Sequence, residues 1–187
     1  MNSNIYLALI HYPVYNKFRD VVNTSITNLD IHDIARTCRT YGVKKYFVVT
    51  PLASQQEMLN RILAFWEKDV AAKYNPDRVQ ALSRLEYSAS LNDTKEKIFS
   101  QEKLDPVVVS TTAVSRNDQT SFDDFKEDLF SSNAPHLILF GTGNGLTEET
   151  LTDSDYILQP VKGNADYNHL SVRSAVAIIL DRLLSEK

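Results

Sequence analysis

The stretch that decides the fold is residues 136–184, which read HLILFGTGNGLTEETLTDSDYILQPVKGNADYNHLSVRSAVAIILDRLL. An apolar run at 137–140 leads directly into GTGNG at 141–145, which holds three of the five glycines in the chain. Glycine accepts positive φ and lets the backbone approach a ligand closely, so this cluster predicts either a ligand-binding loop or a tight turn with a helix cap. A second run at 156–158 leads into Pro160 and Gly163, and helical periodicity begins near Asn168.

Upstream of this stretch, short apolar runs alternate with helical patterns. We predict a helix between Asp30, as its N-cap, and Gly42, and a loop at 13–27 with or without a short strand at 21–26. The other predicted elements are strands at 5–11, 45–50, 85–89 and 107–112 and helices at 53–74, 93–102 and 122–130. Strand–helix–strand order is typical of parallel sheets, so the prediction is a single α/β domain over residues 1–187. Its sheet would be open and mostly parallel, with helices on both faces.

Composition restricts the location of the protein. Of its 187 residues, 43% are apolar and 24% charged, as in ordinary globular domains. No apolar run approaches the ~18 residues that a membrane helix needs, and the N-terminus lacks the basic flank of a signal peptide. We therefore expect a cytoplasmic protein without membrane contact. The single cysteine, Cys38, is expected to be a buried hydrophobic residue in a reducing compartment.

The net charge of −4 argues against nucleic-acid binding across the whole surface, because such proteins are usually basic. Any contact with RNA would have to be made by a local basic patch. Two groups of cations are candidates for this patch, and each is alternatively a solvated face with no partner. The groups are Lys17 with Arg19, and Arg36 with Arg39, Lys44 and Lys45.

Several ligand classes do not fit the glycine cluster. A GxGxxG dinucleotide fingerprint would need glycine where Leu146 stands, and neither a Gly-Lys-Ser/Thr phosphate loop nor a G-x-S-x-G elbow is present. One cysteine and four scattered histidines lack zinc-ligand spacing, so no metal site is predicted. Ligands of open α/β sheets gather at the carboxyl ends of strands, here 110–112, 141–145 and 159–163. What remains is a nucleotide-like ligand held mostly by backbone groups.

Three segments resemble, in the same order, the motifs of the SPOUT (α/β-knot) RNA methyltransferases. The first motif is matched by TNLDIHDIARTCRTYGV at 27–43, and the middle motif by LILFGTGNGL at 137–146. The last motif is matched by ILQPVKGNADYNHLSVRSAVAIIL at 157–180. The chain as a whole further resembles a bacterial SPOUT branch of unassigned substrate, through HYPVYN at 11–16 and YNHLSVRSAVAI at 167–178.

This resemblance implies a C-terminal trefoil knot, S-adenosyl-L-methionine as cofactor and RNA (tRNA or rRNA) as substrate. It also implies a homodimer that forms through the knot and the terminal helix. Residues 53–105 are a family-specific embellishment whose function the sequence does not define, and their position suggests a lid or a substrate surface. Carried over by position, the cofactor-binding residues are Thr111, Thr112, Gly141, Thr142, Gly143, Gly145, Leu146, Ile157, Leu158, Gln159, Pro160, Gly163, Asn168, Leu170, Ser171 and Ala175.

The resemblance also gives four catalytic candidates: Arg36, His169, Asp30 and Asp166. Arg36 stands where ribose-methylating members keep a catalytic arginine. Its permanent charge suits binding a phosphate or stabilising an oxyanion, and the alternative is a helix-surface pair with Asp30 or Asp33. His169 is either a proton acceptor or a helix cap. Asp166 is either the carboxylate that assists a ring nitrogen, as in base-methylating members, or a solvent-facing residue.

Two departures from the family pattern leave the reaction open. Thr142 and Asn144 occupy the glycine loop where ribose methyltransferases carry a glutamate, and His169 stands where asparagine is usual. Methylation of a base and methylation of a ribose therefore both remain possible reactions. Two functions compete, an S-adenosylmethionine-dependent RNA methyltransferase and a non-catalytic knotted module that binds cofactor or RNA. A nicotinamide-dependent oxidoreductase is a third hypothesis.

Overall fold

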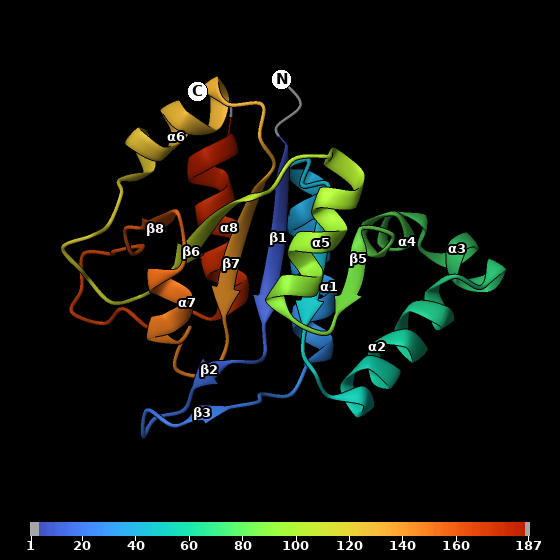
Figure 1. The fold of residues 1–187 in the computed structure, drawn as a ribbon. Coiled ribbons are helices and arrows are strands. Elements are labelled where there is room, and N and C mark those ends of the chain that lie inside the picture. The colour runs from blue at the N-terminus through green and yellow to red at the C-terminus, as the bar shows by residue number, and fades with distance from the viewer. Residues whose placement is uncertain (1–3, 186–187) are drawn as a thin grey trace.

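The computed structural model describes residues 4–185 and contains a six-stranded sheet whose paired strands are all parallel (Figure 1). The order across the sheet is β5-β4-β1-β7-β6-β8. This arrangement confirms the predicted α/β class. The strands are β1 (Ile5–Ile10), β4 (Lys45–Val49), β5 (Leu85–Ser88), β6 (Val107–Thr111), β7 (His136–Gly141) and β8 (Tyr156–Leu158).

β1 is the central strand, and all six of its residues are buried. It pairs with β4 on one side and with β7 on the other. Alternate side chains enter two separate core clusters, one on each face of the sheet. A parallel strand that is covered on both faces has no solvent-facing side, which is why residues 5–10 read as a continuous apolar run.

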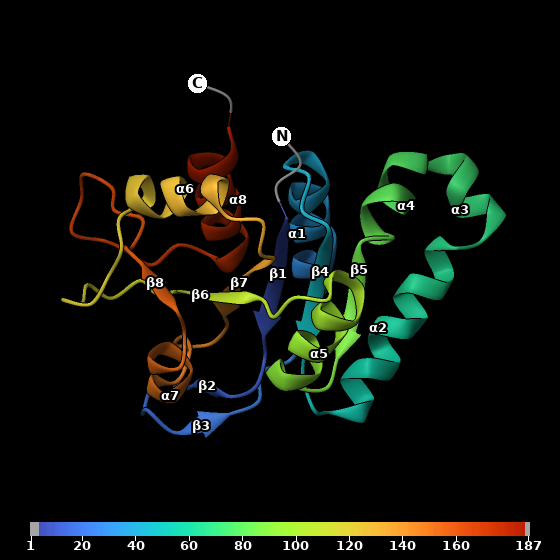
Figure 2. The same ribbon diagram turned by 45° about the horizontal axis from the view of Figure 1, so that its top comes forward.

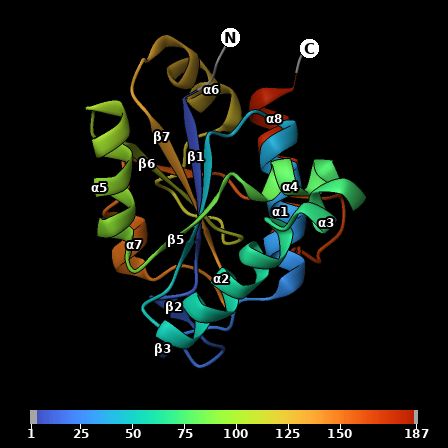
Figure 3. The same cartoon turned by 90° about the vertical axis from the view of Figure 1, so that its right-hand side faces the viewer.

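Helices cover both faces of the sheet. Figure 3 shows the sheet between α5 (Leu91–Glu102) and α7 (Glu148–Thr152) on one side and α1 (Asn28–Thr40), α4 (Pro76–Leu82) and α8 (Val172–Leu184) on the other. α6 (Phe122–Ser131) packs into the same core cluster as α1 and α8. α2 (Ala53–Trp66) and α3 (Asp69–Tyr74) extend beyond the β5 edge of the sheet (Figure 2).

The prediction of one helix over 53–74 was wrong, because this segment is divided into α2 and α3. The motif Asn75-Pro76 follows α3 and begins α4. The side chain of Asn75 accepts a hydrogen bond from the backbone N–H of Arg78 at 3.1 Å, and Pro76 occupies the first turn. A proline is well placed there because the N–H that it lacks would have no helical partner.

Two predicted helix starts were also wrong. The N-cap of α1 is Thr27, whose hydroxyl accepts a hydrogen bond from the backbone N–H of Asp30 at 3.1 Å, so Asp30 lies inside the first turn. α8 begins at Val172 rather than near Asn168, and its cap is Ser171. In both helices the cap is a hydroxyl side chain that accepts a hydrogen bond from the backbone N–H three residues later.

The segment 13–27, predicted mainly as a loop, contains a small antiparallel hairpin. Its strands are β2 (Val14–Tyr15) and β3 (Val21–Val22), so the strand considered at 21–26 is real but shorter. α7 was not predicted, because five residues are too few to show helical periodicity. Among residues 4–185, the structure has no helix that is long and apolar enough to cross a membrane.

Candidate functional site

The carboxyl ends of β6 and β7 open into a cavity of about 460 Å³, which we call the glycine-loop cavity. Its wall is formed by residues 140–145, by residues 111–114 after β6, and by the terminal segment from Val161 to Ile179. Ligand sites for small molecules typically enclose roughly 300–1,000 Å³, so the cavity is large enough for a nucleotide-sized ligand. The terminal segment contributes mainly apolar side chains, from Val161, Leu170, Val172, Ala175 and Ile179.

The backbone of the glycine loop requires glycine at specific positions. Gly143 and Gly145 have φ angles of +58° and +102°, which are rarely adopted by residues with a side chain. A Cβ atom at Gly141 would lie 2.7 Å from the backbone nitrogen of Leu146, so any larger residue there would displace the loop. A Cβ atom at Gly145 would meet no atom within 4 Å. The loop therefore exposes its backbone on the open side, as a ligand held by main-chain groups would need.

The β2–β3 hairpin is docked against this loop. The backbone N–H of Tyr15 donates to the carbonyl oxygen of Gly145 at 2.9 Å, and the N–H of Asn144 donates to the carbonyl of Tyr15 at 2.7 Å. A Cβ atom at Gly143 would lie 2.8 Å from the same Tyr15 carbonyl, so glycine is needed for this close contact. Through this docking the hairpin adds polar residues to the cavity wall, namely Asn16, Lys17 and Arg19.

A partly buried hydrogen-bond chain fixes Thr142 of the glycine loop. The Thr142 hydroxyl donates to the Ile10 carbonyl at 2.9 Å and also contacts the Thr24 hydroxyl. The Thr24 hydroxyl in turn lies 2.9 Å from Nδ1 of His11, which is fully buried. Burial lowers the pKa of His11 to about 4, so its ring is neutral at physiological pH. The glycine loop is thus tied to the end of the central strand.

Most of the predicted cofactor-binding residues line the glycine-loop cavity. They come from segments that are separated along the chain and that the fold brings together at one edge of the sheet. The predicted residues in the wall are Thr111, Thr112, Gly141, Thr142, Gly143, Gly145, Asn168, Leu170 and Ala175.

The remaining predicted cofactor residues lie outside this lining. Leu146 is 5% exposed and pairs with Val14, so it anchors the hairpin to the core. The hydroxyl of Ser171 caps α8. The others belong to β8 or to the loop after it, where some are buried and some exposed, and their contacts with a cofactor stay predictions: Ile157, Leu158, Gln159, Pro160 and Gly163.

The catalytic candidates are distributed differently. His169 lines the cavity and has an exposed side chain, with its ring 5.4 Å from that of Tyr167. The alternative that His169 caps the terminal helix is wrong, because Ser171 does so. Asp166 is exposed on the same loop but outside the cavity wall. Arg36 is exposed on α1 and also does not line the cavity.

The sequence analysis missed Arg173. This residue forms the ion pairs with Asp30 and Asp33 that were considered for Arg36. Its Nη1 atom lies 2.9 Å from Oδ1 of Asp30, and its Nε atom lies 3.4 Å from Oδ2 of Asp33. The alternative in which Arg36 pairs with either carboxylate is therefore wrong. Asp30 is buried at the junction of α1 and α8, where it serves this ion pair. Spacing along one helix could not indicate a partner that lies 143 residues away.

A second cavity, of about 520 Å³, lies between α1, α2 and α4. Aromatic and charged side chains line it, including His32, Trp66 and Arg78. No glycine lines it, so it lacks the backbone-lined wall that favours the glycine-loop cavity. Among residues 4–185, no group of three or more His, Cys, Asp or Glu side chains is arranged to hold a metal ion.

Comparison with known proteins shows the family of this chain. A model of the family described as SAM-dependent RNA methyltransferase matches residues 4–185. An uncharacterized protein of Aquifex aeolicus is 36% identical over 99% of this chain and 90% of its own length. A tRNA (guanine-N(1)-)-methyltransferase of Nitratidesulfovibrio vulgaris is 41% identical over 98% of this chain, but the chain spans only 42% of that relative.

The fold is also similar to solved structures. TrmJ from Z. mobilis superposes with a TM-score of 0.59 over 98% of this chain and 70% of that one, at 14% sequence identity. Such low identity shows a shared fold and no more. The family match covers the whole described chain and includes all three motif segments. The chain belongs to the SAM-dependent RNA methyltransferase family.

Proposed function

We propose that this chain binds S-adenosyl-L-methionine in the glycine-loop cavity and moves its methyl group to a nucleotide of tRNA or rRNA. The observation that carries the proposal is that glycines with positive φ and apolar side chains of the terminal segment line one cavity. Main-chain N–H and carbonyl groups can recognise adenine, and apolar side chains such as Leu170 and Ile179 suit its faces. The cavity residues therefore fit this cofactor.

The chain's own contribution to the reaction is positioning and proton transfer. When bound, S-adenosyl-L-methionine supplies a methyl group attached to a positively charged sulfur. The cavity must hold the attacking oxygen or nitrogen of RNA in line with that methyl, and the attacking atom loses its proton as the new bond forms. His169 is the proposed acceptor of this proton, because its side chain is exposed in the cavity wall. Asp166, on the same loop, is the alternative acceptor.

We also propose that the enzyme is a cytoplasmic homodimer with a C-terminal knot. Two exposed leucines support the dimer: Leu29, 60% exposed, precedes Asp30, and Leu170, 47% exposed, lies shortly before Arg173. Asp30 and Arg173 form an ion pair, so both leucines flank the same junction of α1 and α8. Support for the knot comes from contacts between the segments at 112–120 and 157–168, where Asn168 donates to the Ala113 carbonyl at 2.9 Å.

Arg36 is proposed to bind RNA. It is exposed on α1 and does not line the cavity, so its proposed contact is with RNA outside the cavity of its own subunit. Its guanidinium keeps its charge at every physiological pH and matches the geometry of a phosphate. The proposed role is therefore to hold an RNA phosphate, either on the outer surface or beside the cavity of a second subunit.

Transfer RNA is the favoured substrate class within this proposal. It is the substrate named for the Nitratidesulfovibrio relative, of which this chain spans 42%. The remainder of that relative lies outside the match, so its named guanine-N1 activity is not carried over to this chain. The alternative function, a binding module without transfer, is favoured by the glycine loop itself, where Thr142 and Asn144 replace the usual glutamate.

Purified wild-type chain is expected to transfer label from methyl-labelled S-adenosylmethionine to RNA from cells that lack its gene. His169→Ala should lower the rate of transfer by about 10²- to 10⁴-fold, the usual contribution of a general base, while cofactor binding remains. Arg36→Ala should mainly raise the KM for RNA. Arg182→Ala, which changes an exposed arginine on α8 that belongs to neither basic group and does not line the cavity, is the matched control and should leave both quantities unchanged.

Binding of the cofactor without transfer to any RNA class would support the non-catalytic module and contradict the proposed enzyme. Transfer at the normal rate in His169→Ala would show that another group accepts the proton, and Asp166→Ala would then be the next variant to measure.

A further inference from the structure

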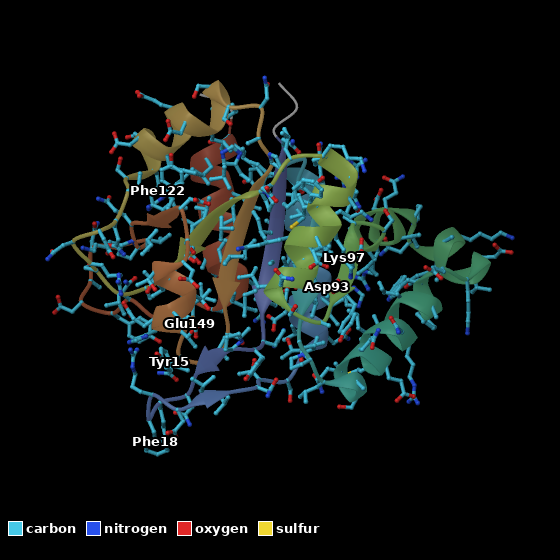
Figure 4. The ribbon with its side chains drawn as sticks, viewed as in Figure 1. Tyr15, Phe18, Asp93, Lys97, Phe122 and Glu149 are labelled. Carbon is cyan, nitrogen blue, oxygen red and sulfur yellow. The ribbon has the colours of Figure 1, made fainter. Side chains whose placement is uncertain are left out.

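The tip of the β2–β3 hairpin displays an aromatic ring between two cations. Phe18 is 72% exposed, and Figure 4 shows it at the outer end of the hairpin, away from the body of the protein. Its neighbours Lys17 and Arg19 both line the glycine-loop cavity. Neither packing in the hydrophobic core nor the proposed cofactor site accounts for an exposed aromatic ring at this position.

The tip is built to hold this ring in place. Oδ1 of Asn16 accepts hydrogen bonds from the backbone N–H groups of Phe18 at 2.8 Å and of Asp20 at 3.0 Å. The amide of Asn16 also donates to the carboxylate of Asp20 at 3.0 Å. Arg19 has a φ of +70°, a strained conformation for a residue with a side chain. Strain that the surrounding structure maintains is frequent at binding sites.

Both cations lie over aromatic rings and are available to an anion. The Lys17 ammonium lies 4.8 Å from the centre of the Phe18 ring, and the Arg19 guanidinium lies 4.1 Å from that of Tyr15. Within residues 4–185, no salt bridge involves Lys17 or Arg19. The mouth of the cavity is therefore positive although the whole chain carries a net charge of −4.

We propose that the hairpin tip is a clamp for single-stranded RNA, in which Phe18 stacks on an unpaired base while Lys17 and Arg19 bind the adjacent phosphates. An exposed ring with flanking cations is the combination that recognises single-stranded nucleic acid. The base would lie next to the nucleotide that enters the cavity. Because Tyr15 is hydrogen-bonded to the glycine loop, the clamp is held at a fixed position relative to the cofactor. This inference rests on the proposed function, since it names how the same site holds its RNA.

The test is binding of bulk tRNA from cells that lack the gene, measured by fluorescence anisotropy with S-adenosylhomocysteine present. Phe18→Ala is expected to weaken binding by about 5- to 150-fold, the equivalent of ~1–3 kcal/mol for one lost base stack. Phe18→Tyr, which keeps the aromatic ring, should bind RNA like the wild type. The matched control is Phe130→Ala on α6, because Phe130 is a 44% exposed aromatic residue outside the cavity wall, and this variant should bind like the wild type.

Lys17→Ala and Arg19→Ala should each reduce the slope of log affinity against log salt by about one unit, as expected for a lost phosphate contact. The thermal shift caused by S-adenosylhomocysteine should be the same in Phe18→Ala and Phe18→Tyr as in the wild type, because Phe18 is not part of the cavity wall. Unchanged RNA affinity and unchanged KM in Phe18→Ala would overturn the clamp and leave the proposed methyl transfer intact. RNA binding that depends on Phe18 in a chain that transfers no methyl would overturn the proposed function and leave the clamp intact.

Discussion

Gly143→Ala is expected to lower the affinity for S-adenosyl-L-methionine by about 100-fold, because two separate costs add up. Alanine is disfavoured at the φ of +58° that this residue adopts, by about 1–2 kcal/mol. Its Cβ would also lie 2.8 Å from the Tyr15 carbonyl, which belongs to backbone and cannot rotate away. The hairpin and the glycine loop must therefore separate, and the cavity wall changes shape.

Isothermal titration calorimetry with S-adenosylmethionine measures this effect directly. Gly42→Ala is the matched control, since Gly42 also has a positive φ of +72° but lies outside the cavity wall, and a Cβ there meets no atom within 4 Å. It should bind the cofactor like the wild type. Equal affinities in the two variants would contradict the assignment of the glycine loop as the cofactor site.

Arg173→Ala is expected to lower the free energy of unfolding by about 3 kcal/mol. The substitution leaves the Asp30 carboxylate, which is only 8% exposed, without its cation in a poorly solvated junction. The arginine itself is 31% exposed, which places the expected loss at the lower end of the range for broken buried pairs. Urea denaturation followed by circular dichroism is the measurement.

Asp33→Ala tests whether the burial of Asp30 causes the expected loss of stability in Arg173→Ala. The carboxylate of Asp33 also contacts Arg173 but is 51% exposed, so its loss should cost less than about 1 kcal/mol. The double variant Asp30→Asn/Arg173→Met, which removes both buried charges, should recover most of the stability lost in Arg173→Ala. Equal losses for Asp33→Ala and Arg173→Ala would show that the buried pair is not what joins α1 to α8.

The sheet could be predicted well because its strands leave a local signal. β1, β4, β6 and β7 are short apolar runs that are bounded by polar residues, proline or glycine, and covering helices on both faces make those runs continuous. Helix ends were harder to predict, because a cap depends on one side chain. Thr27 and Ser171 act as caps, and each stands near other polar residues, such as Asp30 and Asn168, that offered competing starts.

The candidate site could be predicted only in part. Gly141, Gly143 and Gly145 were identified because glycine after a strand has few explanations, and the family motifs added the segment around Asn168. The hairpin's role in the cavity could not be predicted, because Tyr15 meets Gly145 across 130 residues of chain without any local pattern. The pairing of Asp30 with Arg173 was missed for the same reason. The roles of Arg36, His169 and Asp166 stay predictions.

The central claim is that S-adenosylmethionine occupies the glycine-loop cavity, and photochemical crosslinking tests it most directly. Labelled S-adenosylmethionine is irradiated with the purified wild-type chain, and the labelled peptide is identified by mass spectrometry. We expect the label on peptides that carry residues 111–114, 140–145 or 168–179, which form the cavity wall. Label on peptides from α2 or α4, which line the second cavity around Trp66 and Arg78, would contradict the claim.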